Sequence, residues 1–158
     1  MIFAPFQTSA TPNIADLLVF LRGTVGIPDT ALPDNSPYLS WALSYAQQYT
    51  LDAARMIGGD FYCFAVYLLA ASFLLNWAPD NPNSTTPQYF ANIRQQLGLT
   101  GFKAGVVTSA GDSGTSASVL TPQWLSALTL QQLQALQDPY GRQWLAMMQD
   151  FSPVWGIS

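Results

Sequence analysis

The sequence predicts a mainly α fold, a compact helical bundle with a projecting β-hairpin and extended terminal arms. Three observations support this prediction. Cap residues followed by proline recur ahead of segments with helical apolar spacing, a long central stretch is apolar on all sides, and a later stretch rich in Gly, Ser and Thr interrupts the helical pattern. A chain of 158 residues has room for one core, so we expect a single domain over residues 1–158.

Two helices are expected in the first third of the chain. Thr11-Pro12 has the pattern of an N-cap with proline at the first helical position, and apolar residues follow at helical spacing until Gly23. Residues 26–35 hold prolines, aspartates and an asparagine, which predicts a loop. Ser36-Pro37 repeats the cap pattern and starts the second helix. The apolar positions are Ile14, Leu17, Leu18 and Leu21 in the first helix and Tyr38, Trp41, Leu43, Tyr45 and Tyr49 in the second.

The third helix is expected at residues 61–77, between a Gly58-Gly59-Asp60 break and Pro79. The apolar stretch 61–78 is about as long as the shortest membrane-spanning helix, which needs roughly 17 to 20 residues. Polar side chains interrupt it, however, and no Lys or Arg flanks it directly, so we expect a helix buried at the centre of the bundle and no membrane contact. A small membrane-associated protein anchored by 61–78 is the alternative function.

After this helix, residues 80–87 predict a surface loop, and residues 88–97 a short helix that ends at Gly98. Residues 103–119 then predict a β-hairpin with its turn at 111–114, because this stretch is too poor in apolar residues for a core helix. An isolated hairpin is marginally stable in water, so we expect it to lie against an adjacent subunit. The expected interface residues are Val106, Val107, Thr108, Ser109, Asp112, Ser113 and Thr115.

The chain returns to helix near its end. Thr121-Pro122 predicts a turn, Thr129 precedes a helix with Leu130, Leu133 and Leu136, and Asp138-Pro139 caps a last helix. Residues 151–158 form an apolar arm that is too broken by Pro153 and Gly156 to be a regular element. We expect it to dock on a partner outside its own subunit, or alternatively to fold back on its own bundle. The docking residues are Phe151, Val154, Trp155 and Ile157.

The residue inventory argues against an enzyme. The chain has no His and no Glu, and its acids are nine Asp. The 111–114 sequence Gly-Asp-Ser-Gly copies the nucleophile region of trypsin-like proteases, but that mechanism needs a histidine base. We therefore interpret it as a turn sequence. We expect no catalytic, cofactor-binding or metal-binding residues in the chain. An aspartate-dependent hydrolase is the enzymatic alternative. The single Cys63 and the lack of a basic segment before an apolar one at the N-terminus favour synthesis in the cytoplasm.

The charge pattern points to burial of the surface by partners. Charged residues are 9% of the chain and hydrophobic residues 49%, whereas a free soluble domain has about 25% charged residues. The five cations, Arg22, Arg55, Arg94, Lys103 and Arg142, are scattered, so they form no positive run that would neutralise phosphates. We expect a subunit of an assembly that does not bind DNA in a sequence-specific way.

Two segments resemble the paired signatures of a phage protein family encoded in virion gene clusters. The first is Gly105-Val106-Val107-Thr108-Ser109 before Gly111-Asp112, and the second is Asp138-Pro139-Tyr140-Gly141, followed by Arg142-Gln143-Trp144-Leu145. The apolar helix around Tyr67-Leu68-Leu69-Ala70-Ala71 also resembles that family, and the likeness covers residues 36–158. Asp138 stands where Thr is common, which is a conservative change at a helix cap.

This resemblance implies a structural head-tail adaptor, or connector, of a tailed bacteriophage. Such subunits are helical and form a homo-oligomeric ring, typically a dodecamer, between the portal protein and a stopper or tail-completion protein. Genomic DNA passes through the ring, and the resemblance makes the portal or a neighbouring ring the expected docking partner of the arm 151–158. The implied location is the virion neck at the head-tail junction, after synthesis in the host cytoplasm.

Overall fold

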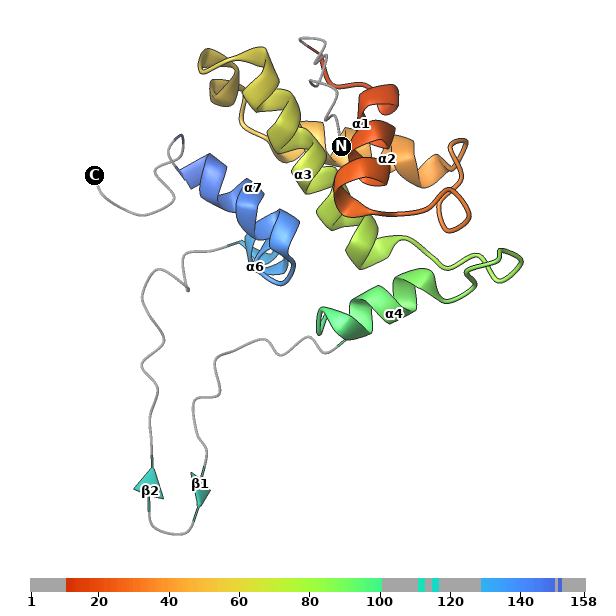
Figure 1. Ribbon diagram of the computed structural model, residues 1–158. Coiled ribbons are helices and arrows are strands. Elements are labelled where there is room, and N and C mark those ends of the chain that lie inside the picture. The colour runs from red at the N-terminus through yellow and green to blue at the C-terminus, as the bar shows by residue number, and fades with distance from the viewer. Residues whose placement is uncertain (1–10, 101–110, 113–114, 117–128, 150, 152–158) are drawn as a thin grey trace.

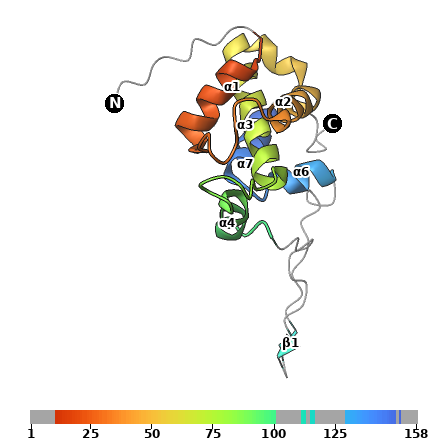
Figure 2. The same cartoon turned by 90° about the vertical axis from the view of Figure 1, so that its right-hand side faces the viewer.

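The computed structural model describes residues 11–100, 111–112, 115–116, 129–149 and 151, and it confirms the mainly α class. The longest helix, α3 (Gly59–Trp77), runs through the middle of the helical body (Figure 1). It contacts α2 (Pro37–Tyr49) on one side and α7 (Pro139–Gln149) on another, and α4 (Tyr89–Gln96) packs near its C-terminal end (Figures 1 and 2). The central position expected for this segment is therefore correct.

The first helix differs from the sequence prediction at both ends. Helix α1 (Ile14–Phe20) is capped by Asn13, whose side chain accepts a hydrogen bond from the Asp16 backbone N–H at 2.8 Å, so Thr11 is not the cap. A π-helical turn, η1 (Leu21–Val25), then carries the chain past Gly23. The turn ends at Gly26, which has a φ of 83° and so needs the left-handed region that glycine tolerates.

The second helix begins as predicted. In α2 (Pro37–Tyr49) the Ser36 hydroxyl accepts from the Tyr38 N–H, and Pro37 occupies the first turn, where its missing N–H is not needed. A 3-10 turn that was not predicted, η2 (Asp52–Met56), leads into α3, which begins two residues earlier than expected because Gly58 is the N-cap. Helix α4 (Tyr89–Gln96) is followed by Gly98 at φ 70°, as its predicted C-cap role requires.

Two charged side chains join the end of α3 to α4. Arg94 of α4 donates to the carbonyl oxygens of Leu75, at 2.9 Å, and of Ala78, which satisfies the last turn of α3. In return, the Asp80 carboxylate accepts from the backbone N–H groups of Phe90 and Ala91 in the first turn of α4. The last turn of α3 is therefore satisfied by a side chain of α4, and the first turn of α4 by a side chain from the loop that follows α3.

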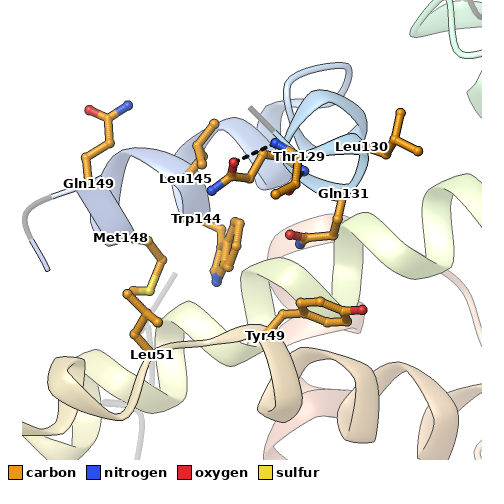
Figure 3. Close-up of a pocket in the computed structure, with 10 residues that line it drawn as sticks. Tyr49, Leu51, Thr129, Leu130, Gln131, Trp144, Leu145, Met148 and Gln149 are labelled. Atoms are coloured by element: carbon orange, nitrogen blue, oxygen red, sulfur yellow. Dashed lines mark hydrogen bonds between the residues drawn. The ribbon is translucent and has the colours of Figure 1, made fainter. Parts of the chain in front are cut away.

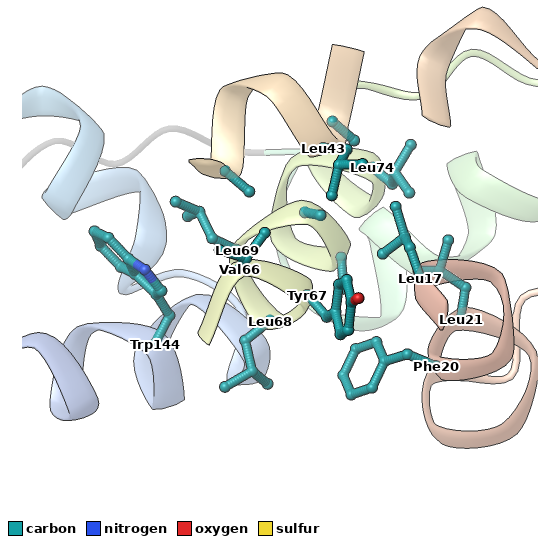
Figure 4. Packing of buried hydrophobic residues seen from close by; sticks show 14 of the residues in the cluster. Leu17, Phe20, Leu21, Leu43, Val66, Tyr67, Leu68, Leu69, Leu74 and Trp144 are labelled. Carbon is teal, nitrogen blue, oxygen red and sulfur yellow. The ribbon is translucent and has the colours of Figure 1, made fainter. Parts of the chain in front are cut away.

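The core is a continuous cluster around α3 (Figure 4). Tyr67 and Leu68 are almost fully buried, and the Phe20 ring of α1 lies 6.2 Å from the Tyr67 ring, centroid to centroid. Trp144 of α7 approaches the same helix from another side (Figure 4). An all-round apolar helix is what this position requires, because its neighbours surround it. Other buried members shown in Figure 4 are Leu17, Leu21, Leu43, Val66, Leu69 and Leu74.

The buried Tyr67 hydroxyl makes the core sensitive to high pH. It accepts a hydrogen bond from the Asn13 N–H at 3.2 Å, and burial raises the pKa of Tyr67 to about 12. An unfolded tyrosine ionises near pH 10, so between pH 10 and 12 the unfolded chain gives up a proton that the folded chain keeps. The stabilising contribution of the neutral hydroxyl is therefore complete below pH 10 and is lost as the pH rises to 12.

We expect the free energy of unfolding to fall over this pH window and the fall to be smaller in Tyr67→Phe. Urea unfolding of both proteins at several pH values between 9 and 12 measures this, since phenylalanine has no proton to lose. The stability difference between wild type and variant should shift in favour of the variant as the pH rises. Parallel curves for the two proteins would contradict the assignment.

Two further helices complete the described body. Helix α6 (Leu130–Ala135) begins after Thr129, as predicted, and Thr129 is its N-cap. Helix α7 (Pro139–Gln149) starts after Asp138, whose carboxylate accepts from the Gly141 N–H at 2.8 Å. Of the predicted hairpin, the structure describes two short strands, β1 (Gly111–Asp112) and β2 (Thr115–Ser116), which pair antiparallel. The rest of 103–119 and the turn expected at 121–122 lie outside the described residues.

Candidate functional site

The best candidate for a binding site is a groove of about 450 Å³ between the end of α2 and the α6–α7 pair (Figure 3). We call it the α6–α7 groove. Leu51 and Met148 lie at one end, and Tyr49 and Gln131 at the other, with Trp144 between them (Figure 3). Its volume is within the range of about 300 to 1,000 Å³ in which proteins hold small ligands or inserted side chains.

Local hydrogen bonds fix the walls of this groove. The Trp144 indole N–H donates to the Thr50 hydroxyl at 3.1 Å, and both side chains are buried, so the indole is held against the end of α2. On the other wall, Thr129 and Gln132 form a capping box: Thr129 N–H donates to Gln132 Oε1 at 3.0 Å, and Gln132 N–H donates to the Thr129 hydroxyl (Figure 3). The groove is therefore built in advance of any ligand.

The lining is uncharged. Among the described residues, apolar side chains form most of it, and the polar groups are amides and the hydroxyls of Thr129 and Tyr49, with no Asp, Glu, Lys or Arg among them. The Gln131 side chain extends toward Trp144 (Figure 3), and its amide also lies near the Tyr45 hydroxyl. Such a groove can bind an apolar anchor and form hydrogen bonds with it through its amides and hydroxyls.

Aromatic side chains extend the groove into a wider uncharged face. The Tyr45 ring lies 4.8 Å from that of Tyr49 and 4.9 Å from that of Phe73, so α2 and α3 present adjoining rings. Burial raises the pKa of the Tyr45 hydroxyl, and the nearby Gln131 amide partly offsets this rise. Trp77 and Leu130 beside these rings are 59% and 78% exposed. The face has the aromatic, ion-poor character of a protein interface.

A buried cluster of polar side chains has a structural role. Asp138 is fully buried and accepts hydrogen bonds from the Ser72 hydroxyl at 2.5 Å and from the Asn76 amide at 3.1 Å, besides that from Gly141 N–H. We call these three side chains, Ser72, Asn76 and Asp138, the Asp138 cluster. It joins α3 to the start of α7. In the sequence, Ser72 and Asn76 are polar interruptions of the apolar stretch 61–78. Their i, i+4 spacing on an apolar helix indicates that they share a polar partner.

The predicted interface residues are only partly described. Asp112 pairs with Thr115 in the β1–β2 ladder, while Val106, Val107, Thr108, Ser109 and Ser113 lie outside the described residues. In the arm, the Phe151 ring packs on Phe61 of α3 with 5.9 Å between centroids. Val154, Trp155 and Ile157 lie outside the described residues. Sequence reasoning missed the α6–α7 groove.

The stretch considered as a membrane anchor is α3. It is the one helix within the described part of the chain that is long and apolar enough to cross a membrane, and 67% of its most apolar window is buried inside the bundle. The central helix of a helical bundle meets the same criteria.

Comparisons with protein-family models, with curated proteins and with solved structures find no match to this chain.

Proposed function

We propose that this chain is a structural subunit of a tailed-phage neck, a head-tail adaptor that assembles with copies of itself into a ring. In this role it lies between the portal protein and a stopper or tail-completion protein, and genomic DNA passes through the ring. The proposal rests on the sequence resemblance described above and on the character of the described surface. No chemistry is required of the subunit beyond recognition of its partners.

The observation that best supports this role is the exposure of large apolar side chains on the described helices. Met56 is 89% exposed, Val19 64% and Trp41 56%, in addition to Trp77 and Leu130. These side chains come from several helices, and charged residues make up only 9% of the chain. A protein that remained monomeric would expose this surface to water, whereas subunits of an assembly cover it.

Three of the four described cations have partners within the chain, which supports passage of DNA without a specific contact. Arg22 donates to the carbonyl oxygens of Ile27 and Leu32 and pairs with Asp34 at 2.7 Å. Arg55 pairs with Asp52 at 3.3 Å, and Arg94 caps α3. Since these guanidinium groups already have partners within the chain, they are poorly placed to form the clustered positive surface that phosphate binding needs.

Two segments are proposed to make the contacts between subunits. The hairpin 103–119 would lie along an adjacent copy, and the apolar residues of 152–158 would dock outside their own subunit. Both segments combine short extended or broken stretches with few charges, which suits contact with a groove or a sheet edge.

The mass of the assembly tests this proposal. We expect the purified protein to form a closed ring of identical copies, measured by native mass spectrometry, and to occur in purified virions at ring stoichiometry. Deleting residues 110–114 should weaken ring formation and leave the helical circular dichroism unchanged. A protein that stays monomeric at micromolar concentration and is absent from virions would contradict the proposal.

A further inference from the structure

Another hollow lies between two loops at the N-terminal end of α2. Its volume is about 450 Å³, and the residues that line it fall within 31–38 and 79–82. We call it the proline hollow, because the Tyr38 ring and four prolines line it: Pro33, Pro37, Pro79 and Pro82. None of the residues at which the described ranges begin or end is among those that line it.

A large aromatic side chain is exposed beside this hollow. Trp41 is 56% exposed, and its ring packs edge-to-face with Tyr38 at 5.0 Å between the centroids. Because Tyr38 also lines the hollow, the Trp41 indole stands at its rim. An indole N–H needs an acceptor when it is buried, and the side-chain amide of Asn35, an exposed residue of the hollow, can supply one.

A second exposed indole, that of Trp77, belongs to the same surface. Tyr45 of α2 packs on Phe73 of α3, with 4.9 Å between the ring centroids. Further along the surface, Tyr38 and Pro79 line the hollow together. Helices α2 and α3 are therefore antiparallel here, and Trp77, which is 59% exposed, lies between these two contacts on α3.

The surface around the hollow is poor in charge. Helix α2 has no charged residue, and the hollow has one, Asp80, whose carboxylate already accepts two backbone N–H groups of α4. An ordinary soluble protein, with about 25% charged residues, would bury charges against this surface without gaining ionic partners. Another copy of this chain, with 9% charged residues, has a matching surface that is poor in ions.

A surface with an exposed ring next to a hollow can pair with itself. In a two-fold interface the same patch is used on both copies, so the patch must contain both the inserted group and the site that receives it. We propose that two copies pair about a two-fold axis, with Trp41 of each copy inserted in the proline hollow of the other. This contact goes beyond the proposed function and does not depend on ring formation.

The exposed indoles supply a substantial part of the area that such a pair needs. A standard interface buries about 800 Å² on each partner. Since a fully buried aromatic side chain hides roughly 150 to 250 Å², the exposed parts of Trp41 and Trp77 contribute about a third of that area. The loops around the hollow and the Tyr38 and Tyr45 rings would supply more, so we expect a dimer that forms at micromolar concentrations.

Native mass spectrometry of the full-length chain and two variants tests this contact. Trp41→Ser removes the inserted ring and leaves the hollow intact, whereas Asn35→Trp fills the hollow and leaves the ring intact. Each variant should bind itself at least about tenfold more weakly than the wild type. When the two are mixed, one of them isotopically labelled, a ring of one chain meets an open hollow of the other. The mixed dimer should therefore exceed both homodimers.

Met56→Ser is the matched control, because Met56 is an apolar residue that is 89% exposed on η2, beyond the other end of α2. This variant should form dimers as the wild type does. An equal loss in Met56→Ser and Trp41→Ser, or a mixture without an excess of mixed dimer, would overturn the assignment of ring and hollow. A wild type that stays monomeric at these concentrations would overturn it as well.

The remaining outcomes distinguish this inference from the proposed function. Dimers that show the expected response to both variants, in a protein that forms no ring, would support the two-fold contact and contradict the adaptor role. Rings that assemble without any response to Trp41→Ser or Asn35→Trp would overturn the two-fold contact and leave the adaptor role standing.

Discussion

Asp138→Ala is expected to lower the free energy of unfolding by about 4 kcal/mol, because it removes the acceptor from three donors in the protein interior. The Ser72 hydroxyl, the Asn76 amide and the Gly141 N–H would lose their shared partner at a position that water does not reach. The start of α7 would also lose its cap. Urea unfolding followed by circular dichroism measures the change.

Asp80→Ala is the matched control for this experiment. Asp80 also accepts two backbone N–H groups at a helix start, but it lies at a partly exposed position, and water can replace it. We expect a loss of about 1 kcal/mol there, which is typical of a helix cap. If both substitutions have the same effect, the Asp138 cluster contributes no more than an ordinary cap.

Gly141→Ala is expected to destabilise the protein by about 3 kcal/mol, since an added methyl group has no room between α6 and α7. A Cβ at this position would lie 2.8 Å from the Cα and 2.9 Å from the carbonyl carbon of Ala135. These are backbone atoms, so the two helices would have to move apart and the α6–α7 groove would change shape. Thermal unfolding measures the loss, and the fluorescence of Trp144 reports on the groove.

Gly23→Ala is the control, because nothing lies within 4 Å of a Cβ at Gly23 and its φ is not positive. Its effect should stay within about 1 kcal/mol, and a gain in stability is compatible with the better helix propensity of alanine. A loss in Gly141→Ala no larger than in Gly23→Ala would show that α6 and α7 can separate without penalty.

Helix starts could be predicted from the sequence where the capping side chain and the backbone N–H that it binds lie close together in the chain. Ser36, Thr129 and Asp138 cap their helices, as expected from side chains that reach a backbone N–H two or three residues away. The first helix was predicted less well, because its π-helical turn shifts the stop from Gly23 to Gly26. A π turn inserts one extra residue, and nothing in the local composition distinguishes the two glycines.

The candidate site could not be predicted from the sequence for a physical reason. Tyr49 and Leu51 meet Gln131 and Trp144 only because α7 packs on α3 beside the end of α2, and no periodicity in one segment encodes that meeting. The same holds for Asp138, which was assigned correctly as a cap but also binds side chains 62 and 66 positions earlier. Contacts between distant segments follow from the packing of whole helices.

The Asp138 cluster has a consequence for how this chain can evolve. Its hydrogen bonds close a loop that contains everything between Asn76 and Asp138, and the entropy of closing a flexible loop grows only with the logarithm of its length, by about 0.6 kcal/mol per doubling. Insertions and deletions in the part of that loop outside α4 and α6 therefore change the entropy of loop closure very little. The hydrogen bonds between α3 and α7 can then keep the described scaffold constant while the length of the connection between α4 and α6 changes.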